Sequence, residues 1–110
     1  MHFVIEFSET VKDDMKWIDK KHHQSIRESI IEQLQYQPNV ETRNRKPLDP
    51  SIREADWELR CGEKNRYRVL YRFWLDEAVT KENHNQNGTV LITAIGEKKN
   101  ERLWIGGGKI

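Results

Sequence analysis

Hydrophobic and polar residues alternate most regularly over residues 66–75, which predict the strand around which the domain is built. Side chains of a strand point alternately to its two faces. The odd positions form a nearly all-apolar face: Tyr67, Val69, Tyr71, Phe73 and Leu75. The even positions place three arginines near a tryptophan: Arg66, Arg68, Leu70, Arg72 and Trp74. One face therefore predicts a hydrophobic core, and the other predicts a binding surface for a negatively charged group.

Shorter apolar segments predict the other strands of a sheet. Residues 3–7 and 57–61 read as strands, and residues 62–65 have the length of a hairpin loop before the arginine strand. Residues 89–95 are the most continuous apolar run, which predicts the most buried strand. The remaining segments are assigned as follows: a long exposed excursion at 76–88, a polar turn or short helix at 97–102, and an apolar end at 103–105.

Two stretches near the N-terminus have helical spacing. Val11, Met15 and Ile18 predict a first helix of about ten residues, and a similar pattern predicts a second helix over residues 22–36. A short polar turn between them predicts a helical hairpin. The element order is then β-α-α-β-β-β, an α+β domain with the hairpin packed on one face of a small antiparallel sheet. We expect the arginines to project from the open face.

Composition narrows the class of protein. The length of 110 residues fits one domain spanning residues 1–110, and a net charge of +1 does not by itself indicate nucleic-acid binding. Cys61 is the only cysteine, which excludes a disulfide framework and predicts a reducing compartment. His22 and His23 lack a third nearby ligand, so no metal site is predicted. The sequence has neither an apolar run of membrane-spanning length nor a secretory signal, so we expect a cytoplasmic protein without a membrane partner.

Several motifs, taken in order, resemble the RelE/ParE superfamily, the toxins of bacterial type II toxin–antitoxin systems. The motifs are Arg45-Lys46-Pro47-Leu48, Trp57-Glu58-Leu59-Arg60, Tyr67-Arg68-Val69-Leu70-Tyr71, Ala94-Ile95-Gly96-Glu97-Lys98-Lys99-Asn100 and Leu103-Trp104-Ile105-Gly106. The resemblance covers roughly residues 43–107. It implies a toxin that needs no cofactor and is held inactive by a cognate antitoxin protein.

The superfamily implies two different activities. RelE-like members bind the ribosome and cut mRNA in its A site, whereas ParE-like members inhibit DNA gyrase and cleave nothing. A third reading is a protein of the toxin fold whose chemistry has been lost. Our interpretation is a toxin that inhibits translation by ribosome-dependent mRNA cleavage, with the gyrase inhibitor as the alternative.

The resemblance also implies roles for individual residues. Arg68 falls on the position that holds the scissile phosphate, and Lys46 and Lys98 fall on two further basic positions, the first of which is a glutamate base in one branch. Trp104 replaces a tyrosine, and its indole can stack on a base but cannot act as a phenolic acid. Asp56 and Glu58 occupy positions where RelE itself has lysines.

RNA cleavage through the 2′-hydroxyl needs a base, a cationic clamp for the phosphate and an acid. Arg68 and Arg72 suit the clamp because guanidinium groups bind phosphate bidentately. Glu58 is the only well-placed carboxylate on a strand expected to pair with theirs. The candidate catalytic residues are therefore Arg68, Glu58, Lys46 and Lys98. The alternative for Glu58 and the arginines is a set of cross-strand ion pairs.

The candidate substrate-binding residues are Arg43, Arg45, Arg60, Arg72, Trp74 and Trp104. Arg43 and Arg45 precede the second strand and suit phosphate contacts, although a solvated basic loop would have the same composition. Trp74 shares a face with the arginines and suits base stacking. Trp57 shares parity with Leu59, so we expect it in the core.

Overall fold

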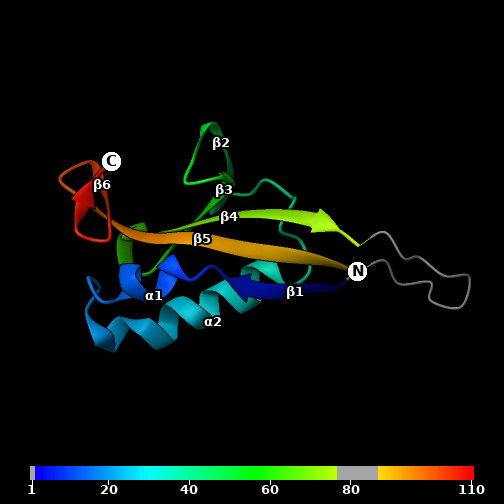
Figure 1. Ribbon diagram of the computed structural model, residues 1–110, viewed down its shortest axis with the longest axis horizontal. Coiled ribbons are helices and arrows are strands. Elements are labelled where there is room, and N and C mark those ends of the chain that lie inside the picture. The colour runs from blue at the N-terminus through cyan, green and yellow to red at the C-terminus, as the bar shows by residue number, and fades with distance from the viewer. Residues whose placement is uncertain (1, 77–86) are drawn as a thin grey trace, which may run out of the picture.

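The computed structural model describes residues 2–76 and 87–110 and shows one curled sheet with helices on one side (Figure 1). The elements are β1 (His2–Phe7), α1 (Thr10–Met15), a 3₁₀ turn (Lys20–His22), α2 (His23–Leu34), β2 (Arg45–Ile52), β3 (Ala55–Cys61), a 3₁₀ turn (Glu63–Asn65), β4 (Tyr67–Leu75), β5 (Asn87–Lys99), β6 (Arg102–Ile105) and β7 (Gly108–Lys109). Most of the predicted excursion at 76–88 lies outside the described residues.

The predicted β-α-α-β-β-β fold with a helical hairpin is wrong. Over residues 2–76 and 87–110 the sheet has seven strands: six follow the order β2-β3-β4-β5-β6-β7, and β1 pairs in parallel with β5. The helix α1 spans only six residues and ends at Met15, so it is not one arm of a hairpin. Ile18 fits the apolar spacing because it is buried, but it lies in the turn after this helix and not in the helix itself.

The sequence pattern also missed β2 and β7. Pro47 and Pro50 lie inside β2, although in the sequence these prolines indicate a loop. A proline is tolerated there because β2 is an edge strand, so its missing N–H breaks no ladder bond. Strand β7 has only two residues, which is too short for an alternating pattern.

One edge of β5 has two different strand partners. Residues 87–92 of β5 pair with β1, and residues 96–99 pair with β6. The gap between them is covered by α1 and the residues before it: the Ser8 and Thr10 hydroxyls each donate to the Thr93 carbonyl at 3.3 Å, and the Asp14 carboxylate accepts from the Ile95 N–H at 3.2 Å. These contacts satisfy backbone groups that neither strand reaches, as buried backbone requires.

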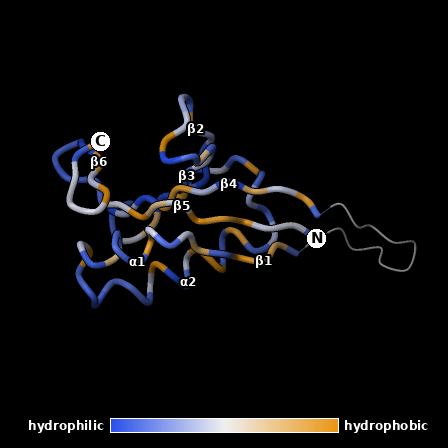
Figure 2. The backbone as a smooth tube through the Cα atoms, in the orientation of Figure 1, coloured by the Kyte–Doolittle hydropathy of each residue, from blue (hydrophilic) through white to orange (hydrophobic). Residues whose placement is uncertain are grey.

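The main core lies between the helices and the sheet. Its buried residues are Phe3, Val11, Met15, Ile18, Ile26, Ile30, Leu34, Leu59, Cys61, Tyr67, Val69, Tyr71, Val90, Ile92 and Ile95. Hydrophobic stretches run along β5 and recur at intervals along α2, whose stripe is Ile26, Ile30 and Leu34 (Figure 2). The predicted core face of β4 is confirmed except at Leu75, which is 43% exposed.

The opposite face of the sheet is not open. Leu70, Ala55, Ala94 and Ile105 form a second buried cluster, with Leu48, Ile52 and Leu103 packed against it. The β2–β3 and β6–β7 hairpins rise from this face on either side (Figure 1). A bulge assists the bending: Leu70 pairs with Ala94 but Tyr71 pairs with Ile92, so Thr93 is the extra residue. The charged residues of this face are therefore divided into separate groups.

Among the residues that the structure describes, no helix combines the length and the apolar character needed to cross a bilayer.

Candidate functional site

Strand register places the four predicted catalytic residues on the same face of the sheet. Arg68 lies opposite Arg60 of β3 and Gly96 of β5, and Glu58 lies opposite Leu70 and Lys46. Directly opposed residues point the same way, and Lys98 shares the face of Gly96 because it lies two residues further on. Arg68, Glu58, Lys46 and Lys98 therefore share the face away from the helices.

Glu58 is held between two arginines. The Arg60 Nε lies 2.9 Å from Glu58 Oε1, and the Arg68 Nε lies 3.9 Å from Glu58 Oε2. Arg60 is partly exposed, whereas Arg68 and Glu58 are largely covered. The alternative of cross-strand ion pairs is therefore present as the Glu58–Arg68 contact between β3 and β4, and the closer Glu58–Arg60 pair lies within β3.

Arg68 is the least accessible of these cations, with only 7% of the residue exposed. Its Nη1 donates to the Asn65 carbonyl, and the Tyr67 carbonyl lies 3.5 Å from the same nitrogen. Burial lowers the pKa of Arg68, and the nearby Glu58 carboxylate opposes that shift. Most of this guanidinium is thus committed to protein partners, which weakens the predicted role of phosphate clamp.

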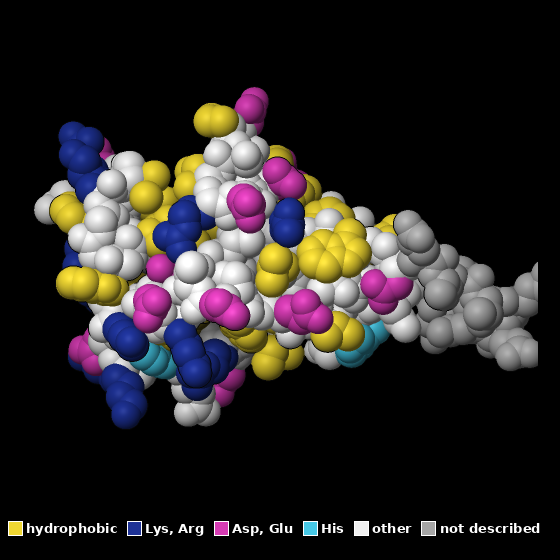
Figure 3. Space-filling model, in the orientation of Figure 1, with side chains coloured by type: hydrophobic (Ala, Val, Ile, Leu, Met, Phe, Trp, Pro, Cys, Tyr) yellow, Lys and Arg dark blue, Asp and Glu magenta, His cyan; other side chains and the backbone are white. Residues whose placement is uncertain are grey.

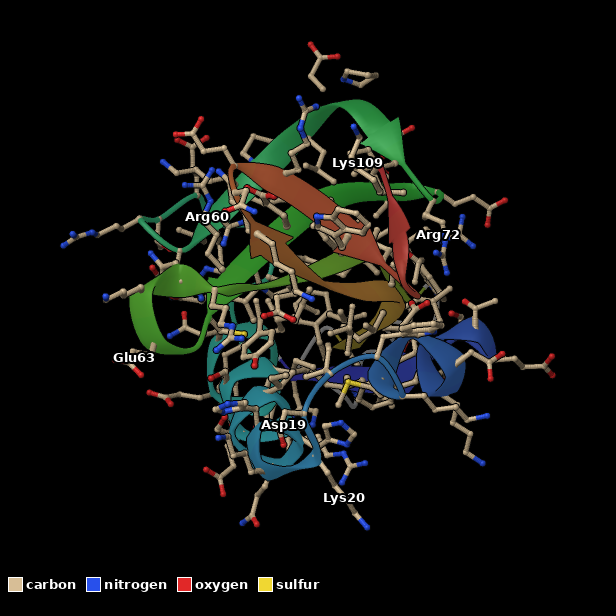
Figure 4. All side chains as sticks on the ribbon, turned by 90° about the vertical axis from the view of Figure 1, so that its left-hand side faces the viewer. Asp19, Lys20, Arg60, Glu63, Arg72 and Lys109 are labelled. Atoms are coloured by element: carbon tan, nitrogen blue, oxygen red, sulfur yellow. The ribbon has the colours of Figure 1, made fainter. Side chains whose placement is uncertain are left out.

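A polar cleft of about 650 Å³ opens beside Arg68 at the end of the sheet. It lies between the β3–β4 loop and the turn after β5, and we call it the basic cleft. Its lining residues are Glu63, Lys64, Asn65, Arg66, Arg68, Glu97, Lys98, Lys99 and Asn100. Figure 4 looks at this end of the molecule, with Glu63 in the loop and Arg60 above it. Five cationic side chains against two carboxylates give this cleft a positive field.

The cations of the basic cleft are not equally free. Arg66 donates from Nε to Glu97, and the Lys99 Nζ lies 3.7 Å from the same carboxylate. The Arg66–Glu97 hydrogen bond raises the pKa of Arg66. Lys64 and Lys98 are exposed and have no ion-pair partner within residues 2–76 and 87–110. These two lysines are therefore the charges most available to an anionic ligand.

The loop that carries Lys64 is shaped by its backbone. Gly62 has φ +82°, and a Cβ at this position would lie 2.6 Å from the Tyr67 ring. Lys64 and Asn65 also have positive φ, at 56° and 54°. The chain thus reverses tightly and turns Lys64 toward the cleft instead of continuing β3.

Other predicted site residues lie elsewhere. Arg45 is buried and donates to the carbonyls of Val40 at 3.0 Å and Gln33 at 2.6 Å, so it fixes the loop after α2. Arg43 is exposed in that loop, and Lys46 lies 4.0 Å from Glu41. None of these three side chains lines the basic cleft.

Arg72 and Trp74 lie beyond Leu70, on the other side of the second cluster. The Arg72 guanidinium sits over the Trp74 ring at 5.7 Å, and Trp74 is 43% exposed. The Arg72 Nε is buried and has no hydrogen-bond partner in the described part of the chain. Figure 4 shows Arg60 at the left and Arg72 at the right of the same face of the sheet. This pair therefore forms a second surface, separate from the basic cleft.

The two remaining tryptophans of the strands also differ. Trp104 pairs with Glu97, so it has the opposite parity to Lys98 and lines a separate hollow of about 180 Å³ with Trp17 and Asp14. Trp57 packs against the main core and stacks on Tyr71 at 6.3 Å, which confirms the prediction made for it.

Sequence reasoning missed Lys64, Arg66 and Lys99 as cleft residues. The order of the strands could have identified them. In a sheet of consecutive antiparallel strands, the β3–β4 loop and the β5–β6 turn lie at the same end, so their lysines and arginine come together there. Within residues 2–76 and 87–110, no group of three His, Cys, Asp or Glu side chains is arranged to hold a metal ion.

Comparisons with known proteins found no relative of this chain. No protein-family model matches the chain, and no curated protein or solved structure matches it at a significant level.

Proposed function

We propose that the protein is a toxin of the RelE/ParE type that binds RNA at the basic cleft and inhibits translation by cutting mRNA on the ribosome. The observation that carries the proposal is the placement of Lys64 and Lys98, two exposed lysines without an ion-pair partner among the described residues, in a cleft of 650 Å³. Arg68 also lines this cleft, and its neighbours Glu58 and Arg60 lie next to Arg68 outside the lining. An ammonium group is a point charge that contacts phosphate oxygens without demanding one orientation. A cognate antitoxin would keep such an activity in check.

The proposed cleavage assigns one role to each group. Glu58 takes the proton of the 2′-hydroxyl, whose oxygen attacks the phosphorus and expels the 5′-oxygen of the next nucleotide. Lys98 gives a proton to that leaving oxygen, so the products are a 2′,3′-cyclic phosphate and a 5′-hydroxyl. Arg60, which is partly exposed beside Glu58, stabilises the charge on the phosphate. Arg68 acts through Glu58 as a positioning residue.

A second candidate function is a ParE-type toxin that binds DNA gyrase and cleaves nothing. The burial of Arg68 and the indole in place of a phenol at Trp104 favour it, because both remove groups that a nuclease of this type uses. The two candidates differ in the molecule that is damaged in the cell, which is mRNA for the nuclease and DNA for the gyrase inhibitor.

The deciding experiment induces the protein in bacteria and follows protein synthesis, transcript integrity and DNA breaks. We expect synthesis to stop within minutes and cut transcripts to accumulate. Glu58→Gln and the double variant Lys64→Ala/Lys98→Ala should abolish both effects, whereas the matched control Lys20→Ala/Lys21→Ala, two exposed lysines outside the cleft, should not. DNA breaks with continuing translation would instead favour the gyrase inhibitor. Intact transcripts, DNA and growth would indicate a fold without toxicity.

A further inference from the structure

A patch of side chains lies on the face of the sheet away from the helices, at the end of β4 and β5 that is far from the basic cleft. It is built in two rows that each cross the neighbouring strands β1, β5 and β4. We call it the outer patch, and its residues are, row by row, Val4, Thr89 and Trp74, then Glu6, Leu91 and Arg72. Figure 3 shows hydrophobic side chains over β1, β4 and β5, with acidic and basic ones beside them.

The apolar residues of the outer patch remain accessible. Val4 is 52% exposed and Trp74 is 43% exposed, and neither belongs to the second cluster. Leu91, in the other row, is half-buried. Tryptophan and arginine are enriched among the residues that contribute most to the affinity of protein interfaces. Exposed apolar side chains with charged residues beside them are typical of a contact surface.

The two charged residues of the patch lie at its opposite borders. Glu6 of β1 and Arg72 of β4 are both in register with Leu91 of β5, so one strand separates the acidic border from the basic one. The Arg72 guanidinium is directed along its own strand, 5.7 Å from the centre of the Trp74 ring. Within residues 2–76 and 87–110, neither Glu6 nor Arg72 forms an ion pair. Both charges are therefore available to a partner.

A second copy of the outer patch has the complementary arrangement. When one copy is turned over about a two-fold axis along β5, the β1 border of each copy faces the β4 border of the other. Glu6 of each protomer then faces Arg72 of its partner, and the two Leu91 side chains meet on the axis. Val4 faces Trp74 in the same way. Sheets packed face to face keep their strands nearly aligned about 10 Å apart, a space that two layers of side chains fill.

The charge pattern distinguishes a second copy from other occupants of this face. A nucleic-acid strand would pair with Arg72 but would also meet the Glu6 carboxylate, whereas a second copy satisfies both charges. We propose that the outer patch is the contact surface of a symmetric dimer of this chain, in which Glu6 of each protomer pairs with Arg72 of the other. The patch crosses only three strands, so the interface is small and the dimer is weak. This inference does not rest on the activity of the basic cleft.

The first test measures the mass of the full chain by sedimentation velocity at protein concentrations from about 5 μM to about 500 μM, a range suited to a small interface. We expect a monomer–dimer equilibrium. Glu6→Arg and Arg72→Glu each place like charges opposite one another twice, so each should weaken the dimer at least about tenfold. The matched reversals Glu32→Arg and Arg27→Glu, exposed on α2, should change its affinity less than about twofold. A chain that stays monomeric throughout, or equal losses in the matched reversals, overturns the proposal.

The second test mixes the two reversed variants. The Glu6→Arg chain has two basic borders and the Arg72→Glu chain has two acidic ones, so the mixture should regain at least about tenfold in affinity over either variant alone. The double variant Glu6→Arg/Arg72→Glu exchanges the borders and should dimerise like the wild type. Circular dichroism checks the fold of each chain. Folded variants that regain no affinity in the mixture or in the double variant overturn the proposal.

A third variant tests the apolar part of the patch without changing a charge. Val4→Asn alters an exposed side chain, so the fold should be kept, and the dimer should weaken at least about tenfold because two apolar contacts are lost. An unchanged dimer overturns the proposal. So does a chain that stays monomeric but binds a single-stranded oligonucleotide and loses that binding in both Val4→Asn and Arg72→Glu, because the face would then contact nucleic acid.

Discussion

The two faces of the sheet are both closed, but by different means. Two helices cover one face and bury a continuous core that runs from Phe3 to Ile95. The other face is covered only where the β2–β3 and β6–β7 hairpins meet over Leu70, and its buried cluster is small. Charged residues of the second face lie outside this small cluster and differ in their own burial. Lys98 is exposed, whereas Arg68 is buried beside Glu58 and the Asn65 carbonyl.

The largest expected effect compares a fully buried leucine from each face. Leu59→Ala on the helix face should lower the free energy of unfolding by about 3–4 kcal/mol, because it opens a cavity in a rigid core. Leu70→Ala should cost less, about 2–3 kcal/mol, because the hairpins above it can settle into the space. Urea unfolding of both variants measures the difference. A larger loss for Leu70→Ala would show that the second cluster is the more rigid one.

The next effect concerns a titratable group in the helix-face core. Burial raises the pKa of the Cys61 thiol to about 11, although the Arg68 charge partly opposes the shift. In the unfolded chain the thiol has a pKa of about 8.5, so the protonated form is favoured by folding. Stability from this group is complete below pH 8.5 and is lost as the pH rises toward 11.

Cys61→Ala provides the control for that titration. The difference in unfolding free energy between wild type and Cys61→Ala should fall by about 2–3 kcal/mol between pH 8.5 and 11. Tyr71 and Tyr67 also have a raised pKa through burial, and both remain in the variant. The contribution of Tyr71 cancels in the difference, and that of Tyr67 nearly does, because the Cys61 charge is the smallest cause of its shift. A difference that stays constant over this range would contradict the buried thiol.

The next prediction concerns the burial of Arg68 on the face opposite the helices. Arg68→Met removes hydrogen bonds to backbone carbonyls and leaves Glu58 with Arg60 as its partner, which should cost about 2 kcal/mol of unfolding free energy. The matched variant Arg43→Met, an exposed arginine in the loop after α2, should leave stability nearly unchanged. Thermal and urea unfolding give the comparison. Equal stability of the two variants would mean that Arg68 is more accessible than its 7% exposure indicates.

This expectation also changes how the site is tested. Loss of toxicity in an Arg68 variant would not distinguish a phosphate contact from a weakened fold. Lys64, Lys98 and Glu58 are better probes, because the first two are exposed and Glu58→Gln preserves the shape of the side chain.

Most of the correct sequence predictions came from the alternation of side chains along the strands. The alternation over residues 66–75 assigned Tyr67, Val69 and Tyr71 to the main core, and it placed Arg68 and Leu70 on the opposite face. Turn residues marked the β3–β4 hairpin. These are local signals, since they depend on neighbours along one chain segment.

The errors concern contacts between distant segments. Arg68 is buried beside Glu58 of the neighbouring strand β3, a contact that the alternation within β4 does not specify. The helical spacing of Val11, Met15 and Ile18 was real, but α1 ends at Met15, and its place is set by the gap between β1 and β6. Likewise, Lys64 and Lys99 join the cleft only through strand order.

The smallest effects compare the two ends of the opposite face in RNA binding. Lys98→Ala should reduce the slope of log affinity against log salt by about 0.7 for a single-stranded oligonucleotide, because one phosphate contact is lost. Trp74→Ser should change affinity by less than about twofold, although a stacked base would be worth about 1–3 kcal/mol. The reason is its position: Leu70 and the hairpins above it separate Trp74 from the basic cleft. Fluorescence anisotropy at several potassium chloride concentrations measures both variants. A tenfold loss of affinity for Trp74→Ser would contradict this prediction. It would mean that RNA contacts both the basic cleft and Trp74, so that the second cluster lies within the RNA-binding surface and not at its edge.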